Sequence, residues 1–197
     1  KLITDRNLLF GGVATGGEGQ VQMRGRQPIG AQFEQSMLMR RWTSHEFAAS
    51  TQDDFRPTHY RQMAGLMCYY DTTDFSYACL SWDEDNGRVL HVLHKQGDKD
   101  WYQTPQLKTP INLPDEGPVE LRVTVSNAAL QFFYRTEPSF TWLPTGDVLD
   151  ATTFSDEGPT DDAMKFTGAF VGVATHDPIQ EKLWADFRSF SLINKRL

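Results

Sequence analysis

Two of the five histidines in this 197-residue chain are spaced closely enough to suggest metal chemistry. His91 and His94 lie three residues apart in the sequence HVLH, within a run that is typical of a strand. Strand residues three apart point to opposite faces, whereas metal ligands must converge on one ion. The spacing therefore argues against a histidine-metal site.

Two acidic stretches, DEDNG at 83–87 and SDEGPTDD at 155–162, could recruit a structural calcium ion. Neither keeps the ligand spacing of an EF-hand loop, and acidic turns are usually just solvated. We therefore expect no metal and no cofactor, and keep a structural calcium ion as the weaker alternative.

Signatures of nucleophilic catalysis are missing from the sequence. It has no G-x-S-x-G elbow and no phosphate-cradling Gly loop, and neither Cys68 nor Cys79 has neighbours that would lower a thiol pKa. The 26 Asp and Glu residues supply many accidental carboxylate pairs, so their number identifies no acid and base. The residues alone indicate no catalytic constellation.

Composition narrows the class of partner. Aromatic residues make up 12% of the chain, and the net charge of -7 with a pI near 5.2 argues against nucleic acid or an anionic membrane as main partner. A neutral partner such as a sugar remains open. No run approaches the roughly 18 apolar residues of a membrane helix. The sequence begins with Lys1 and not with an initiating Met. We expect a soluble, processed or trimmed piece, cytoplasmic or secreted.

Short apolar runs bounded by Gly, Pro, Asp or Asn recur along the chain, and no amphipathic helix exceeds two turns. Asn86-Gly87 is a strong hairpin signal, and VSNAA at 125–129 suggests a second turn. This pattern predicts an all-β fold, an antiparallel β-sandwich with jelly-roll topology. The Gly-rich stretch 1–20 is expected to be an N-terminal arm or linker, and 21–197 the sandwich.

The sequence PVELRVTV at 118–125 alternates apolar and polar residues, as a sheet with one wet face requires, but the stretch 61–90 does not. With DTTD as a hairpin loop, Cys68 is predicted opposite Tyr77 and Cys79 opposite Leu66. One face then carries Leu66, Cys68, Tyr70, Phe75, Tyr77 and Cys79, and the other Met67, Tyr69, Ala78, Leu80 and Trp82. We interpret the cysteines as free thiols on diagonally neighbouring positions. Both faces need cover by a ligand, the chain's own arm or loops, or a partner domain.

Arginines follow an apolar run in RRW at 40–42. A buried charge needs a partner, and Asp186 interrupts the apolar pattern of LWADF. We expect Arg40 or Arg41 to point inward and pair with a carboxylate such as Asp186, the alternative being two solvated arginines at a strand end.

Four segments together resemble a known family. They are RGRQPIGAQFEQSMLMRRW, FRPTHYRQMAGLMCYYDTTDFSYACLSWDEDNGRVL, GPVELRVTVSNAALQFFYR with VLDATTFSDE, and FTGAFVGVATHD with ADFRSF. In this order they resemble the C-terminal concanavalin A-like sandwich of glycoside hydrolase family 43 β-xylosidases and α-L-arabinofuranosidases. The likeness covers about 25–190.

The resemblance implies that catalysis belongs to a five-bladed β-propeller domain, which needs on the order of 300 residues and does not fit in this chain. Three functions follow: an accessory domain that helps to close the xylose-binding pocket of the propeller, an autonomous carbohydrate-binding module for xylan-type polysaccharide, or a free-standing enzyme. We favour the first, with xylo-oligosaccharides or arabinoxylan fragments as substrates, and expect no catalytic machinery in this chain alone.

The resemblance also names a site residue. A Phe that opens the FTGAFVG strand reaches the rim of the xylose pocket in the resembled enzymes, and Phe166 matches it. Phe166 follows a polar acidic loop, whereas Phe170 lies between small residues and should be core. The alternative is that Phe166 plugs the end of the sandwich. Trp101 and Tyr102 could stack on a sugar ring, or simply pack at a sheet edge.

Overall fold

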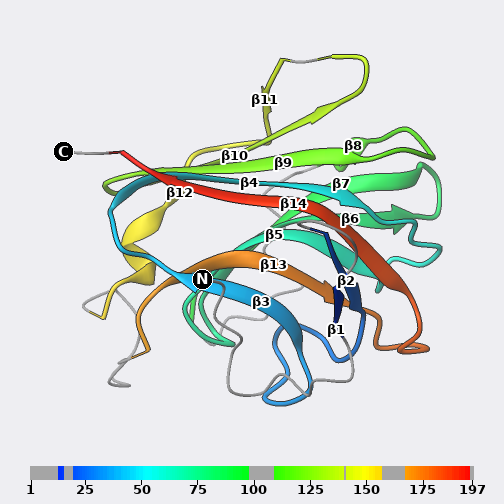
Figure 1. The fold of residues 1–197 in the computed structure, drawn as a ribbon, viewed down its shortest axis with the longest axis horizontal. Coiled ribbons are helices and arrows are strands. Elements are labelled where there is room, and N and C mark those ends of the chain that lie inside the picture. Colours follow the sequence, from blue (N-terminus) through cyan, green and yellow to red (C-terminus); the bar gives the residue numbers. More distant parts are fainter. Residues whose placement is uncertain (1–12, 16–19, 98–108, 140, 157–166, 196–197) are drawn as a thin grey trace.

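The computed structural model describes residues 13–15, 20–97, 109–139, 141–156 and 167–195. They form two sheets with antiparallel strand pairs, packed face to face (Figure 1). The predicted antiparallel β-sandwich is therefore confirmed. None of the described residues lies in a helix long and apolar enough to cross a lipid bilayer.

The eight-stranded sheet runs in the spatial order β1 (Val13–Thr15), β2 (Val21–Arg24), β14 (Trp184–Asn194), β4 (Glu46–Asp54), β9 (Val119–Ser126), β10 (Ala129–Thr136) and β11 (Leu143–Pro144), with β12 (Leu149–Asp150) also paired to β10. The six-stranded sheet runs in the order β3 (Ser36–Arg41), β13 (Phe170–His176), β5 (Met63–Tyr69), β6 (Phe75–Asp83), β7 (Gly87–Lys95) and β8 (Ile111–Asn112). A short 3-10 helix, η3 (Ala151–Phe154), follows β12 directly.

The main core lies between the two sheets. Strand β9 buries Val119, Leu121, Val123 and Val125 and leaves the residues between them partly exposed, as the alternation predicts. Burying a side chain of this size contributes about 1.5–3 kcal/mol relative to leaving it in water. Facing side chains from the six-stranded sheet, among them Leu66 and Leu80, complete this cluster.

The β5–β6 hairpin has a different register from the predicted one. Cys68 lies opposite Ser76, one residue away from the expected Tyr77. The cause is the loop 70–74, where the Tyr70 N–H donates to the Asp74 carbonyl (2.9 Å) and the Asp71 carboxylate accepts from the Asp74 N–H (2.9 Å). Because strand side chains alternate, a shift of one residue moves every β6 side chain to the opposite face.

The cysteines therefore occupy opposite faces and are not diagonal neighbours. Cys68 belongs to the core between the sheets, and Cys79 to the cluster on the outer face of the six-stranded sheet. Both are buried and free, which confirms the interpretation as free thiols.

The outer face of the six-stranded sheet is also buried, as the lack of alternation predicts. Its cluster consists of Ile29, Met37, Met39, Met63, Met67, Tyr69, Phe75, Tyr77, Cys79, Leu93 and Ala174. Ile29 comes from the connection between β2 and β3, and with Tyr77 and His176 it lines a cavity of about 10 Å³. Part of the cover for this face is thus the chain's own loop.

Both predicted turns are present. Strands β6 and β7 pair from Asp83 with Gly87, and Gly87 has a φ of 74°, which suits glycine because it has no Cβ to clash. Strands β9 and β10 are joined through Asn127, whose φ is 52°. Asn tolerates this left-handed conformation better than most residues.

Two charged residues, one from each sheet, are buried without a direct ion pair between them, and the Asp53 carboxylate oxygens have no hydrogen-bond partner among the described residues. Asp53 on β4 is fully buried, and Arg88 on β7 is 1% exposed. The Arg88 Nη1 donates to the carbonyls of Pro114 (3.1 Å) and Gly117 (2.8 Å). Burial raises the pKa of Asp53, and the nearby Arg88 charge opposes part of that rise.

Candidate functional site

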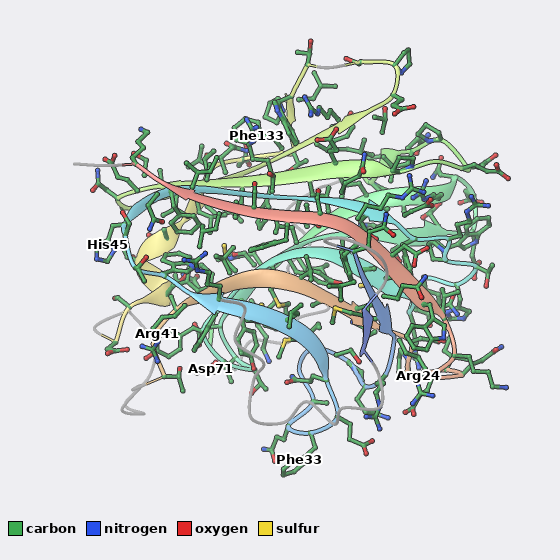
Figure 2. All side chains as sticks on the ribbon, viewed as in Figure 1. Arg24, Phe33, Arg41, His45, Asp71 and Phe133 are labelled. Carbon is green, nitrogen blue, oxygen red and sulfur yellow. The ribbon has the colours of Figure 1, made fainter. Side chains whose placement is uncertain are left out.

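A pocket of about 520 Å³ opens at the end of the sandwich where β3 ends and η3 lies. Its size is within the range of small-ligand sites, about 300–1,000 Å³. It is lined by Arg41, Trp42, His45, Asn127, Ala151, Thr152, Phe154, Ser155, Asp156, Gly168 and Ala169. Figure 2 shows Arg41 and His45 on this side of the molecule, with Asp71 of the β5–β6 loop nearby.

The inner wall of the pocket is aromatic. The ring centroids of Trp42 and Phe154 lie 5.5 Å apart, and Phe47 meets Trp42 edge-on with the centroids 4.9 Å apart. The backbone N–H of Trp42 donates to the Ala169 carbonyl (2.9 Å), which fixes the chain just after β3. The aromatic wall is therefore continuous with the core and rigidly held.

Helix η3 is set by its N-cap. The Asp150 carboxylate accepts from the Thr152 backbone N–H (2.8 Å) and hydroxyl (2.7 Å), and the Ala151 N–H donates to Ala128 (2.8 Å). Such a cap satisfies backbone donors that have no partner within the helix. It directs Phe154 into the core and leaves Thr152 exposed at the pocket.

Tyr70 connects the two chain segments at the far rim of the pocket. Its buried phenol hydroxyl donates to the Asp156 carboxylate, and its backbone carbonyl accepts from the Thr167 hydroxyl (3.1 Å). Burial, followed by the bond to Asp156, raises the pKa of Tyr70, so the phenol stays protonated and acts as a donor at neutral pH.

Arg41 braces the same rim. Its Nη2 donates to the Thr167 carbonyl (2.7 Å), and its guanidinium lies over the Phe170 ring, 5.2 Å from the centroid. Gly168 has a φ of 70°, and a Cβ there would lie 2.5 Å from the Arg41 Nη1. A glycine at this position therefore allows Arg41 to reach Thr167.

The predicted site residues Phe166, Trp101 and Tyr102 lie outside the described residues. In the sequence, Phe166 directly precedes Thr167. Asp156, earlier in the chain, and Gly168, just after Thr167, both line the pocket. Phe170 differs from expectation: it begins β13 and is only partly buried, packing against the outer cluster with the Arg41 guanidinium over its ring.

The predicted pairing of Arg40 or Arg41 with Asp186 is wrong. Arg41 is exposed and contacts Thr167, and Asp186 on β14 accepts instead from the Gln22 amide (2.6 Å). Among the described residues no ion pair involves either arginine. The physical reason is topology, since β3 and β14 belong to different sheets.

The histidines behave as the spacing predicts. On β7, His94 lies on the side of Val92, and its Nδ1 is 2.7 Å from the Ser76 hydroxyl, whereas His91 lies on the other side of the strand. Asp83 in the first acidic stretch caps its own turn by accepting from Asn86 N–H (2.9 Å). The described part of the chain contains no group of three or more His, Cys, Asp and Glu residues that could hold a metal ion.

Sequence reasoning missed the role of Tyr70 and Trp42. The tyrosine pair at the end of a doubly apolar strand was a usable signal, because a buried phenol needs a partner for its hydroxyl. Trp42 gave none, since a tryptophan after a strand is usually ordinary packing.

Comparison with known proteins bears on the origin of this fold and pocket. Residues 13–192 match the family model described as the beta xylosidase C-terminal concanavalin A-like domain. The chain belongs to this family. The resemblance to family 43 xylosidases is therefore confirmed.

Relatives in the family are much longer than this chain. A xylosidase/arabinosidase 43B from Humicola insolens is 37% identical over 165 residues, which cover 81% of this chain and 30% of that protein. A putative beta-xylosidase from Escherichia coli K12 is 32% identical over 91% of this chain and 33% of that protein. The crystal structure of a xylan beta-1,4-xylosidase from Bacillus halodurans superposes with a TM-score of 0.83 at 30% identity, over 89% of this chain and 33% of that one. The chain thus spans about one third of the length of these relatives.

Proposed function

We propose that this chain is the accessory β-sandwich of a xylan-degrading glycoside hydrolase of the β-xylosidase type. It packs on a catalytic five-bladed β-propeller and helps to close the xylose-binding pocket of that domain. The coverage carries the proposal: nearly the whole chain corresponds to one third of proteins named as xylosidases. The remaining two thirds of such proteins have room for a separate catalytic domain.

In this proposal, Phe166 is the residue that reaches the xylose pocket. Its support is the position in the chain, immediately before Thr167, which is fixed by Tyr70 and Arg41 at the rim. An aromatic ring at the pocket entrance excludes water and restricts the pocket to short substrates such as xylo-oligosaccharides or arabinoxylan fragments. Its contribution is desolvation and positioning of the substrate, not proton transfer.

The first test asks whether the chain acts with a partner. The chain alone is assayed on 4-nitrophenyl β-xyloside and then co-expressed with the propeller domain and analysed by gel filtration. We expect no turnover by the chain alone and co-elution of the two domains. Turnover by the pure chain that disappears when one of its own carboxylates is replaced would contradict an accessory role.

The second test concerns Phe166 in the assembled two-domain enzyme. An aromatic ring that packs on the bound substrate contributes about 1.5–3 kcal/mol of apolar contact, so Phe166→Ala should lower kcat/KM for xylobiose about 10- to 100-fold at nearly unchanged Tm. Phe33→Ala is the matched control, because Phe33 is 67% exposed and lies away from Arg41 and His45 (Figure 2). A large loss of stability with intact kinetics would instead indicate that Phe166 plugs the sandwich.

The pocket itself favours a second candidate, an autonomous carbohydrate-binding module. Its aromatic wall, with polar groups at Arg41, Asn127 and Thr152, suits a neutral sugar. Retention of this chain on insoluble xylan tests the idea. Trp101→Ala and Tyr102→Ala then test whether these aromatics stack on the sugar, since unchanged retention removes them from the site.

A further inference from the structure

Two strands of the eight-stranded sheet each bring an arginine onto the same aromatic ring. Arg122 on β9 and Arg135 on β10 lie on the outer face of this sheet, and their guanidinium carbons are 4.1 Å and 4.5 Å from the centroid of the Trp142 ring. Trp142 directly precedes β11, which pairs with the other edge of β10 and lies in the strip at the top of Figure 1. The indole is therefore the common partner of both cations.

The two arginines differ in how their charge is balanced. Arg135 forms an ion pair with Glu120 (2.6 Å), its cross-strand neighbour on β9. The Arg122 side chain forms no ion pair or hydrogen bond within the ranges that the structure describes, and its nitrogens are accessible to solvent. Among the described residues, this small area thus has an unbalanced positive charge, although the whole chain has a net charge of -7.

An arginine in this state is prepared to bind an anion. A guanidinium is planar and can donate two parallel N–H bonds to one carboxylate, and such charge-assisted bonds are roughly twice as strong as bonds between neutral groups. The stacking on Trp142 fixes the Arg122 side chain, so less side-chain entropy is lost when a ligand binds. The unbalanced charge also attracts an anion from solution.

The segment that supplies the indole is itself held in place. The Thr145 N–H donates to the Phe132 carbonyl (2.9 Å), and the Gln131 amide donates to the Gly146 carbonyl (3.1 Å). Both bonds join residues shortly after Trp142 to β10, next to the pairing of β10 with β11. The stack of indole and guanidinium groups is therefore fastened to the sheet.

The neighbours of Arg122 indicate which kind of anion fits. Its cross-strand partner on β4 is Ser50, whose hydroxyl lies 2.9 Å from the Ser191 hydroxyl, and its partner on β10 is the half-buried Phe133 (Figure 2). Arg122 thus lies between serine hydroxyls on one side and the rings of Phe133 and Trp142 on the other. A pyranose presents hydroxyls at its edge and C–H groups on its faces, so this mixture suits an acidic sugar better than a small inorganic anion.

We propose that the outer face of the eight-stranded sheet binds xylan chains that carry uronic acid side groups, with the Arg122 guanidinium as the partner of the uronate carboxylate. Binding of the acidic sugar requires only this chain, whereas its assignment to xylan rests on the proposed function. The surface is also separate from the pocket beside η3, because neither Arg122 nor Trp142 lines that pocket.

The first experiment measures binding by this chain alone, using isothermal titration calorimetry. The probes are a xylo-oligosaccharide that carries one glucuronic acid and the same oligosaccharide after reduction of its carboxyl group to a neutral alcohol. Because the reduced probe lacks the charge-assisted bond, we expect the acidic probe to bind about tenfold more tightly. This preference should shrink as salt is added, since salt screens exposed charges.

Three variants test whether Arg122 causes the preference. Arg122→Gln should abolish it, and Arg122→Lys should retain only part of it, because lysine keeps the charge but lacks the planar fork. Arg188→Gln is the matched control: it removes the same charge from the same sheet, but Arg188 is already paired with Asp54 (2.5 Å), so the preference should stay unchanged.

A fourth variant and thermal unfolding separate binding from a purely structural role. Trp142→Leu leaves the Arg122 charge in place and removes its support, so the acidic probe should bind about three- to tenfold more weakly even if Arg122→Gln folds poorly. A lower Tm in Arg122→Gln with an unchanged preference for the acidic probe would mean that the stack only fastens the segment before β11. That result would overturn the inference.

The remaining outcomes distinguish this inference from the proposed function. Equal affinity of the wild type for both probes, or affinity for inorganic phosphate equal to that for the acidic probe, would overturn the acidic-sugar site. If the acidic probe binds as expected but no propeller domain co-elutes, the proposed function fails and the acidic-sugar site stands. A preference shown by the free chain and lost in the assembled two-domain enzyme would place this face at the domain contact and overturn its role in substrate binding.

Discussion

The two buried charged residues Asp53 and Arg88 give the sharpest prediction about stability. Arg88→Met keeps an apolar stem of similar length but removes the charge that opposes the cost of burying Asp53. It also removes the donor to the carbonyls of Pro114 and Gly117. Because Asp53 and Arg88 lie on strands of different sheets, the loss should affect the whole sandwich.

The magnitude follows from the burial of both groups. Leaving a buried carboxylate without its compensating charge costs about 3–5 kcal/mol, and Arg88 is the cation whose charge opposes the pKa rise of Asp53. For a domain of this length, 1 kcal/mol corresponds to roughly 2–4 °C in Tm, so a decrease of about 6–20 °C is expected at pH 7.5. Arg56→Met is the matched control, since the Arg56 side chain is 60% exposed and its loss should change Tm by no more than about 2 °C.

The pH dependence identifies the cause. A carboxyl group whose folded-state pKa is raised binds a proton more tightly in the folded than in the unfolded state. The ionised form therefore costs stability above the folded-state pKa, and this cost disappears as the pH falls through it. The difference in unfolding free energy between Arg88→Met and wild type should be smaller at pH 5 than at pH 7.5.

A double variant completes the test by urea or thermal unfolding. Asp53→Leu together with Arg88→Met replaces the pair with apolar side chains and should recover most of the lost stability. Two results would refute the reasoning: a Tm decrease of less than about 3 °C in Arg88→Met, or a difference from wild type that widens at pH 5.

Two further predictions concern the six-stranded sheet. Burial lowers the pKa of His176 to about 4. The folded protein therefore resists protonation of this residue, and the free energy of unfolding should fall by about 3 kcal/mol in total as the pH drops from 6.5 toward 4. His176→Gln should flatten that part of the pH profile of unfolding. A Cβ at Gly65 would collide with the Ala78 carbonyl and lie 2.9 Å from the Cys79 Cα. Gly65→Ala should therefore lower the free energy of unfolding, measured with denaturant, by about 1–3 kcal/mol. The control Gly30→Ala should be neutral, because a Cβ at Gly30 meets no atom within 4 Å.

The sheets were predictable where the residues alternate. Strand β9 alternates strictly, so its core face could be named residue by residue. The β5–β6 hairpin was predictable as a doubly buried hairpin but not in register, because the loop bonds of Asp71 and Tyr70 decide the pairing. When both faces are apolar, either register buries apolar side chains, so the hydrophobic pattern cannot choose between them.

The site was predictable only in part for a related reason. The resemblance pointed to Phe166, which lies outside the described residues and stays a prediction, whereas the described residues Gly168 and Ala169 line the pocket. The contacts of Tyr70 and Arg41 join residues about 86 and 126 positions apart in the sequence, and no local pattern specifies such pairs. The same limit explains the Asp186 error, since charge and burial suggested a pair that the sheet order does not bring together.

The double burial of the β5–β6 hairpin has a consequence for the pocket rim. Strand β5 is buried along its whole length, with Leu66 and Cys68 packed between the sheets and Met67 and Tyr69 in the outer cluster. Tyr70 follows this strand directly, so its position is set by packing on both sides. Functional groups need a rigid support to hold a productive geometry, and a strand fixed on both faces provides one. The apolar second face of β5 therefore helps to hold Tyr70, and with it the contacts to Asp156 and Thr167, in one place.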